Sequence, residues 1–359
     1  IMSIVNKKSK ILVAMSGGVD SSVAAYLLKE DGHDVVGITM CLGVADVVND
    51  SSVKCCGAEA INDARRVCQS IGIPHYVLDF SADLENMVIK NFVDEYISGR
   101  TPNPCVRCNE YLKFGKLLEY AKNMGFDFLA TGHYAGIKEI NGDYFLCRPK
   151  DNKKDQTYFL YSIKKADLSK ILFPLAEFTK DEIREIAHAA DLTVASKAQS
   201  QDVCFVPGND YKNFVSKRMG KIEYGDIVSI SGDLLGKHEG IIKYTRGQRG
   251  GLGIALGRPQ YVVEIDVDNN RIIVGDKKDL LTKKLMASNV NRFVEEFPKT
   301  VFVQIRYGHK QASCSLDFID GNKASVVFDL PQEAVTKGQS VVFYKNNIVL
   351  GGGTIESYS

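Results

Sequence analysis

The chain has 359 residues, 45% of them hydrophobic and 25% charged, and its 45 Lys and Arg almost balance its 44 Asp and Glu. This composition excludes collagen-like, low-complexity and disordered chains, and the length predicts about two to three domains. No apolar run approaches the ~18 residues of a bilayer span and residues 1–10 are polar, so we expect a cytoplasmic chain without membrane contact. Nine irregularly spaced cysteines favour free thiols over a disulfide framework.

The first half of the chain alternates short apolar runs with amphipathic stretches of helical length. The runs predict buried parallel strands at Lys10–Met15, Val35–Met40, His75–Leu78 and Phe128–Ala130. The amphipathic stretches predict helices at Ser21–Glu30, Ala58–Ser70, Asp83–Ile97 and Tyr111–Asn123. Asn141-Gly142 predicts a hairpin turn between Ala135–Ile140 and Tyr144–Cys147, and Thr179 with Glu182 forms a capping box that begins a further helix. This alternation is typical of an open parallel sheet with helices on both faces.

After residue 208 the hydrophobic period shortens towards two. Short strands are predicted at Asp226–Ile230, Tyr261–Asp266, Arg271–Val274, Val301–Tyr307, Ala312–Phe318, Ser325–Phe328 and Val341–Tyr344. Many short strands with polar turns predict one or two small barrels. We therefore expect an α/β domain over 1–208, a central β-rich domain over 209–280 and a C-terminal β-barrel over 281–359.

Charge is unevenly distributed along the chain. Residues 1–99 carry 8 basic and 13 acidic side chains, whereas residues 100–170 carry 13 basic and 8 acidic ones. Phosphate contacts depend on local positive charge, so the near-zero total does not exclude an RNA partner.

The segment from Ser16 to Ser22, Ser-Gly-Gly-Val-Asp-Ser-Ser, lies directly between the first strand and the first helix. Glycines let a backbone approach a phosphate, the helix N-terminus attracts an anion, and Asp20 could hold a magnesium ion. No Lys follows the glycines, so the lysine-bearing P-loop pattern is not met. An ordinary Gly-Gly turn is the alternative. The segment resembles the pyrophosphate loop of ATP pyrophosphatases, which split ATP between its α- and β-phosphates.

Cysteines form the second group of candidate site residues. Cys105 and Cys108 lie in a proline-containing loop before a helix, near Arg100 and Arg107, and Cys204 lies at the end of the α/β domain. A nearby cation and a helix N-terminus lower a thiol pKa and make a better nucleophile. Buried core cysteines and half of a zinc site are the alternatives.

These segments together resemble the tRNA-specific 2-thiouridylases (MnmA/TrmU family). The matching pieces are Met15–Ser22, Gly37–Met40, Gly99–Phe114, Ala130–Tyr134, Lys154–Tyr158, Ser200–Phe205, Tyr244–Gly253, Gln304–Tyr307 and Gly351–Ile355. The resemblance implies an adenine nucleotide alpha hydrolase-like (ATP pyrophosphatase) domain followed by the small central domain and the C-terminal barrel.

The resemblance also implies a reaction: adenylation of the 2-carbonyl oxygen of the wobble uridine of a tRNA, then sulfur transfer from a protein persulfide. It places ATP, with Mg²⁺, on Ala14, Met15, Ser16, Gly17, Gly18, Val19, Asp20, Ser21, Met40 and Gly132. Cys204 would carry the persulfide and Cys108 would be its catalytic partner. The partners implied are tRNAs for lysine, glutamate and glutamine, and a sulfur-relay protein or cysteine desulfurase as donor.

The family's tRNA-contacting positions correspond to residues from all parts of the chain. Those beside the target base are Asn103, Pro104 and Cys105, and the others are His133, Lys154, Asp155, Gln156, Arg306, Tyr307 and Gln339. Many family members carry Asp where this chain has Cys105. That departure leaves open a [4Fe–4S] cluster on Cys105, Cys108 and Cys204.

Two other function classes are weighed against tRNA thiolation. An amidating synthetase with the same loop would not need Cys108 and Cys204. A non-catalytic metal-binding or RNA-binding module would not need the Ser-Gly-Gly-Val-Asp-Ser-Ser loop. The sequence therefore favours an enzyme that uses ATP and thiols on tRNA.

Overall fold

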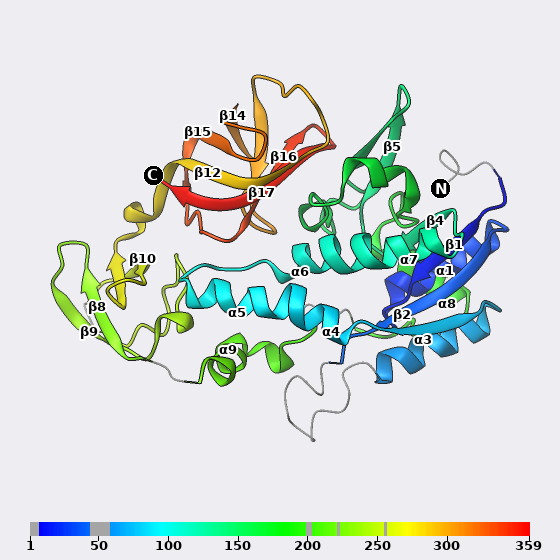
Figure 1. Ribbon diagram of the computed structural model, residues 1–359, viewed down its shortest axis with the longest axis horizontal. Helices are drawn as coiled ribbons and strands as arrows, with labels where there is room; N and C mark the ends of the chain where they lie inside the picture. The colour runs from blue at the N-terminus through cyan, green and yellow to red at the C-terminus, as the bar shows by residue number, and fades with distance from the viewer. Residues whose placement is uncertain (1–6, 44–57, 199–202, 221–222, 255–256) are drawn as a thin grey trace. The chain divides into compact units, whose positions relative to one another are not determined.

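The computed structural model of the chain, drawn in Figure 1, describes residues 7–43, 58–198, 203–220, 223–254 and 257–359. Its internal contacts divide it into a first unit (1–88, 105–205 and 346–350) and a second unit (89–104, 206–345 and 351–359). The predicted three-domain boundaries at 208 and 280 stay a prediction. Residues 200–202 of the matching segment Ser200–Phe205 lie outside the described residues.

A parallel five-stranded sheet organises the first unit, in the order β3-β2-β1-β4-β7. The strands are β1 (Lys10–Ala14), β2 (Asp34–Cys41), β3 (His75–Asp79), β4 (Phe128–Thr131) and β7 (Ile171–Leu172). The four predicted parallel strands are confirmed, and the two-residue β7 was not predicted. The expectation that β3 is buried is wrong: Tyr76 is 60% exposed, because β3, beside β2, is the edge strand of the sheet among the described residues.

Helices connect these strands or follow the last of them. They are α1 (Val19–Glu30), α3 (Ala58–Ser70), α4 (Ser81–Leu84), α6 (Pro104–Arg107), α7 (Leu118–Asn123) and α8 (Lys180–Ala189). Two π-helical segments, Glu85–Ile89 and Cys108–Leu117, interrupt the helices predicted as continuous, and α5 (Lys90–Ile97) completes the earlier of them. The capping box of Thr179 and Glu182 is present at the start of α8.

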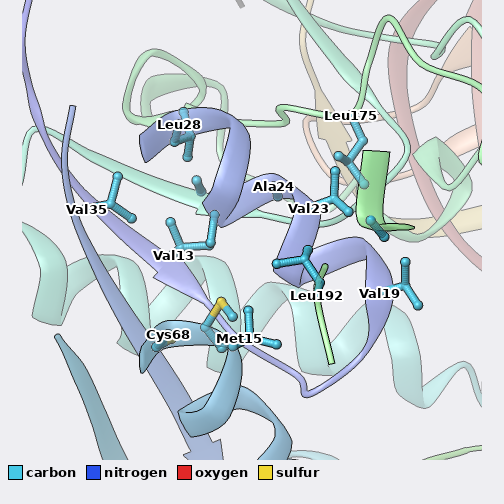
Figure 2. Packing of buried hydrophobic residues seen from close by; sticks show 14 of the residues in the cluster. Val13, Met15, Val19, Val23, Ala24, Leu28, Val35, Cys68, Leu175 and Leu192 are labelled. Carbon is cyan, nitrogen blue, oxygen red and sulfur yellow. The ribbon is translucent and has the colours of Figure 1, made fainter. Parts of the chain in front are cut away.

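The core of the first unit lies where α1, α3 and α8 meet one face of the sheet. Figure 2 shows Val13 and Met15 from the sheet side among Val23 and Leu28 of α1, with Cys68 of α3 close to Met15. Leu12 is 1% exposed but does not belong to this cluster. Because neighbouring residues of a strand face opposite sides, both faces of β1 are covered.

A hairpin and two short 3₁₀ segments follow the sheet strand β4. The hairpin strands β5 (Gly136–Ile140) and β6 (Asp143–Cys147) are antiparallel, and Asn141 and Gly142 have φ of 53° and 86°. Positive φ at both central residues is the geometry that the predicted Asn-Gly turn requires. The 3₁₀ segments are Thr157–Phe159 and Lys165–Lys170.

The second unit contains an antiparallel-rich sheet in the order β10-β11-β8-β9, with only β11 and β8 parallel. Its strands are β8 (Gly225–Ser229), β9 (Leu234–His238), β10 (Tyr261–Asp266) and β11 (Arg271–Gly275). Ile227, Tyr244, Val262 and Ile272 belong to the small core beside this sheet. Helix α9 (Tyr211–Met219) and β9 were not predicted; short 3₁₀ turns lie at Ile241–Lys243 and Lys277–Leu280.

A closed barrel ends the chain, in the order β12-β15-β14-β13-β16-β17 with β12 also paired to β17. The strands are β12 (Leu281–Arg292), β13 (Val301–Gln304), β14 (Ala312–Phe318), β15 (Ala324–Glu333), β16 (Ser340–Lys345) and β17 (Ile348–Tyr358). This arrangement confirms the predicted C-terminal β-barrel, and β13 ends three residues earlier than predicted. Within the described part of the chain, no helix combines the length and apolar character that a membrane crossing requires.

Candidate active site

The predicted pyrophosphate loop joins β1 to α1, at the carboxyl end of the sheet. Gly17 has φ of +70°, and a Cβ there would lie 2.3 Å from the carbonyl oxygen of Ala60, so a side chain would displace backbone. Gly18 caps α1 without any side-chain hydrogen bond to the helix. The first-turn N–H groups and the positive end of the helix dipole therefore face a loop that suits an anion.

The serines of this loop bond mainly to the loop itself. Ser22 Oγ donates to the carbonyl of Gly18 at 2.8 Å, and Ser21 Oγ donates to the same carbonyl at 3.2 Å. The Ser16 N–H donates to Ser21 Oγ at 3.1 Å, whereas the Ser16 side chain is exposed. We conclude that Ser21 and Ser22 hold the loop in shape, and that Ser16 is the hydroxyl placed towards solvent.

Asp20 is tied to two residues far along the chain. Its Oδ1 accepts hydrogen bonds from the Tyr134 hydroxyl at 2.8 Å and from Lys180 Nζ at 2.5 Å. The Tyr134 pKa is raised by burial and by the charge of Asp20. A partly buried ion pair therefore already occupies one oxygen of the carboxylate proposed for magnesium.

The remaining predicted nucleotide-binding residues lie on neighbouring strands. β2 and β4 both pair with β1 in parallel, so Met40 near the end of β2 and Gly132 just after β4 lie at the same edge of the sheet as the loop. A Cβ on Gly132 would lie 2.6 Å from the backbone nitrogen of Ser21. The structure thus brings Gly132 against the loop, by close backbone packing.

The three candidate thiols lie close enough to influence one another. Cys105 and Cys204 are exposed and Cys108 is half-buried. The surrounding protein atoms nevertheless desolvate a thiolate: burial and the two other thiols raise the pKa of Cys204 to about 12. Burial likewise raises the pKa of Cys105 and of Cys108. Residues that are far apart in the sequence are therefore neighbours, in their thiol form at neutral pH.

Lys113 is the cation of this thiol group, and sequence reasoning missed it. Its charge lowers the pKa of Cys105, Cys108 and Cys204, against the larger effect of burial. Lys113 lies in the π-helical segment that begins at Cys108, and a π-helix repeats after about five residues. Lys113 is five residues after Cys108, so a prediction that this segment is π-helical would have placed it beside Cys108.

The arginines predicted to activate the thiols are engaged elsewhere. Arg100 Nε pairs with Glu95 Oε2 at 2.7 Å. Arg107 donates to the Met87 carbonyl at 3.0 Å and lies 4.7 Å from the ring centroid of Tyr111. Neither arginine is among the groups that lower a thiol pKa here, so the expectation of arginine-lowered thiol pKa values was wrong.

His133 lies beside Lys113, which disfavours a positive charge on its imidazole. Its Nδ1 shares a 2.7 Å hydrogen bond with Thr131 Oγ1, and its Nε2 lies 3.5 Å from Lys113 Nζ. Burial and the Lys113 charge hold the His133 pKa well below its usual value. A neutral imidazole at this position can accept or donate a hydrogen bond but offers no charge to a phosphate.

Other residues predicted to contact tRNA form internal bonds. Asp155 accepts from the Thr157 N–H and pairs with Arg148 at 3.1 Å, and Gln156 Oε1 accepts from the Tyr134 N–H at 2.9 Å. In the second unit, Gln339 Nε2 donates to the carbonyls of Thr101 and Pro102, at 3.1 and 3.2 Å. These three side chains therefore shape loops within their own units.

Two of the residues predicted to contact tRNA lie on the surface of the second unit. Arg306 is exposed and Tyr307 is 49% exposed, and both follow the end of β13. Asn103 and Pro104 also belong to the second unit, whereas Lys154, Cys105 and Cys108 belong to the first. The candidate tRNA residues are thus divided between the two units.

Comparison with protein families matches the chain from near its start to near its end. Residues 9–208 match the tRNA methyl transferase HUP domain, residues 212–276 the tRNA methyl transferase PRC-barrel domain, and residues 282–355 the aminomethyltransferase beta-barrel domain. These matches agree with the parallel sheet, the four-stranded sheet and the C-terminal barrel of the structure.

Curated relatives match over almost the whole chain. The tRNA-specific 2-thiouridylase MnmA 1 of Syntrophus aciditrophicus is 52% identical, over 97% of this chain and 93% of the relative. The tRNA-specific 2-thiouridylases MnmA of Clostridium perfringens and Carboxydothermus hydrogenoformans are each 47% identical, over 98% and 99% of this chain and 99% of each relative. With the loop, the thiols and the domain order in place, this chain belongs to the tRNA-specific 2-thiouridylase (MnmA) family.

Proposed function

We propose that this chain is the ATP-dependent enzyme that converts the wobble uridine of tRNA anticodons to 2-thiouridine, with release of AMP and pyrophosphate. The observation that carries the proposal is the grouping of Cys108 and Cys204 in the same unit as a pyrophosphate loop. An amidating synthetase would use the loop but has no need for the paired thiols.

The proposed reaction has an adenylation stage of one step and a sulfur-transfer stage of two steps. First, the uridine 2-carbonyl oxygen attacks the α-phosphorus of ATP, the α–β phosphoanhydride bond breaks, and pyrophosphate leaves. The terminal sulfur of a Cys204 persulfide then attacks C2, and the C2–O bond breaks to release AMP. Finally the Cys108 thiolate attacks Cys204 Sγ, which leaves the transferred sulfur on C2 and forms a Cys108–Cys204 disulfide. A thiol reductant must regenerate both cysteines before the next cycle.

The residues present fit ATP at the loop. Ala14 to Ser21 offer a Cβ-free approach at Gly17 and Gly18 and a helix N-terminus, and Met40 and Gly132 lie at the same sheet edge. Mg²⁺ usually enters with nucleotide phosphates and needs only one or two protein carboxylates. Asp20 would be such a carboxylate, with the oxygen that Lys180 does not occupy.

An iron–sulfur cluster is less well supported. Across the residues that the structure describes, no group of three or more His, Cys, Asp or Glu side chains is arranged to hold a metal ion. Cys105, Cys108 and Cys204 thus have the right ligand type but not a shared coordination point. We derive no step through a cluster, and iron and sulfide analysis of oxygen-free protein tests for one.

The partners follow from the same chemistry. The substrate would be tRNA, with those for lysine, glutamate and glutamine expected, and the sulfur would come from a relay protein or a cysteine desulfurase. Asn103, Pro104 and Cys105 would lie beside the target base, and exposed Arg306 and Tyr307 would contact the tRNA elsewhere. We also propose that the enzyme acts in the cytoplasm.

The test is mass spectrometry of tRNA nucleosides after incubation with ATP, unmodified tRNA and a persulfide-donating protein. Wild-type protein should form 2-thiouridine, Cys204→Ala and Cys108→Ala should form none, and Cys314→Ala, which removes a buried barrel thiol, should retain activity. Free sulfide can bypass Cys204, so it must be absent. Full activity of Cys204→Ala with the donor protein would contradict the role of this cysteine.

A second measurement tests the RNA partner. Basic side chains that neutralise phosphates make affinity fall as salt rises. The tRNA affinity should therefore weaken markedly between about 50 and 200 mM salt. An affinity that does not change over this range would contradict an electrostatic tRNA interface.

A further inference from the structure

The pyrophosphate loop carries no lysine of its own, but the fold brings two lysines to it from distant positions. Lys180 is the first residue of α8, and Lys197 lies shortly after that helix. Lys180 Nζ donates to Asp20 at the helix end of the loop, and Lys197 Nζ donates to the carbonyl of Gly17 within it. Two ammonium groups therefore flank the segment from Gly17 to Asp20.

Lys180 is held in place from several sides. The residue is 8% exposed, its backbone N–H donates to Asp151 Oδ2 at 3.0 Å, and its ammonium lies 5.9 Å from the ring centroid of Tyr134. An ammonium group has three donors, and Asp20 Oδ1 takes one at 2.5 Å. Packing fixes the position of this largely buried ammonium group, and it therefore also fixes the directions of the donors that Asp20 does not use.

Lys197 is more accessible than Lys180, and hydrogen bonds hold its ammonium group in place as well. Its Nζ donates to Asp63 Oδ2 at 2.6 Å and to the Gly17 carbonyl at 3.2 Å, while its side chain is 37% exposed. Gly17 has φ of +70°, which turns the peptide at the point where Lys197 meets it. The ammonium therefore lies at the backbone of the loop and still reaches solvent.

We propose that Lys180 and Lys197 bind the β- and γ-phosphates of ATP and hold the departing pyrophosphate. A helix dipole contributes only about half a unit charge at its N-terminus, which is little against a triphosphate. In P-loop proteins one lysine within the motif reaches the β- and γ-phosphates. Here two lysines from outside the loop supply that charge, and the inference rests on the proposed use of ATP.

The test compares the binding of MgATP, pyrophosphate and AMP to the full chain by calorimetric titration. Lys180→Met and Lys197→Met should each weaken ATP and pyrophosphate binding by about tenfold or more, because a hydrogen bond to a charged group is lost. AMP binding should change by less than about twofold, since its phosphate is the one retained on the nucleoside. Lys29→Met, at the far end of α1, should bind all three ligands like wild type.

Lys180→Met removes the ion-pair partner of the half-buried Asp20, which keeps only its hydrogen bond from Tyr134, so the variant is expected to destabilise the domain. The double variant Lys180→Met with Asp20→Asn removes that charge, and its thermal unfolding establishes whether it is folded. A folded double variant and a folded Lys197→Met that bind ATP and pyrophosphate as tightly as wild type would overturn this inference alone. Wild-type protein that binds neither ligand would overturn the proposed function with it. A third outcome is that the variants bind ATP and pyrophosphate more weakly but the wild-type protein makes no 2-thiouridine. This outcome would support phosphate binding by the two lysines and overturn thiolation.

Discussion

Lys180 Nζ and Asp20 Oδ1 lie 2.5 Å apart, although 160 residues separate them in the sequence. The contact forms because α8 packs beside α1 in the core of the first unit. The capping box of Thr179 and Glu182 fixes where α8 begins, and so places Lys180 at its first position. A local helix-start signal thus positions a charge at a loop encoded far earlier in the chain.

The close packing of Gly132 predicts a sharp intolerance to any side chain. In Gly132→Ala, the new Cβ would lie 2.6 Å from the Ser21 nitrogen, and this contact is with backbone that cannot rotate away. We expect a loss of about 1–3 kcal/mol in the free energy of unfolding and weaker ATP binding. Chemical denaturation and ATP titration measure the two effects.

Gly136→Ala is the matched control for this substitution. Its nearest neighbour would be the Ala176 Cβ at 3.6 Å, an ordinary contact, so stability and ATP affinity should change little. If Gly132→Ala kept both properties of wild type, the loop would be able to move away from β4 without cost.

The raised pKa of Cys204 predicts slow alkylation despite its exposure. The reactive species is the thiolate, and burial raises the pKa of Cys204 to about 12 from 9.0. At pH 8 its thiolate fraction should therefore be at least about tenfold below that of a free cysteine, and its rate should still rise above pH 9. Peptide mapping after timed iodoacetamide treatment gives the rate, with urea-unfolded protein as the control. Rapid alkylation of folded protein at pH 7 would contradict the assigned environment.

Lys113 predicts a coupled effect on all three thiols. Lys113→Met removes the charge that lowers the pKa of Cys105, Cys108 and Cys204, so each pKa should rise further. We expect alkylation of Cys108 at pH 8 to slow by roughly tenfold and thiolation to slow with it, and Lys113→Arg to restore part of both.

Lys116→Met is the control on the same segment. Lys116 pairs with Asp83 at the surface and is not among the charges that act on the thiols. Lys116→Met should therefore leave the alkylation rates of Cys105, Cys108 and Cys204 unchanged. If the cysteines of Lys113→Met were alkylated as fast as those of wild type, Lys113 would not lower the pKa of the thiols.

The parallel sheet of the first unit was predictable because apolar strands and amphipathic helices alternate regularly in its sequence. β1, β2 and β4 are paired as a βαβ pattern requires, and the Asn141-Gly142 turn specifies the hairpin. Lys113 was not predictable, because its place beside Cys108 depends on a π-helix. Gly115 shows the packing involved: a Cβ there would lie 2.8 Å from the Glu110 carbonyl oxygen, five residues before it.

β17 was missed because three consecutive glycines erase the alternation of side chains that marks a strand. In the structure these glycines allow β12 to approach closely: a Cβ on Gly353 would lie 2.8 Å from the Ser288 carbonyl, and one on Gly351 would lie 2.3 Å from that of Asn291. The pairing of β12 with β17 closes the barrel. The close approach, which the sequence pattern does not encode locally, explains both the glycines and the missed strand.

The segment Tyr244–Gly253, one of those that carry the family resemblance, contains two arginines with different environments. Arg246 donates to the Val263 carbonyl at 2.7 Å, to the Leu280 carbonyl at 3.2 Å and to Thr282 Oγ1 at 3.3 Å. Its guanidinium also lies 3.9 Å from the ring centroid of Tyr358. Arg246 is therefore a structural residue, whereas Arg249 is exposed.

This difference predicts opposite effects for two substitutions three residues apart. Arg246→Met loses its hydrogen bonds and cation–π contact and leaves partly buried carbonyls unpaired, so unfolding should require about 2–4 kcal/mol less free energy. Arg249→Met should leave stability unchanged and weaken tRNA binding, with a shallower dependence on salt, because it removes one charge at the surface. Thermal unfolding and tRNA titration at two salt concentrations separate the two. A stable Arg246→Met protein with weakened tRNA binding would mean that Arg246 faces RNA, and an Arg249→Met protein with wild-type tRNA affinity would exclude Arg249 from the interface.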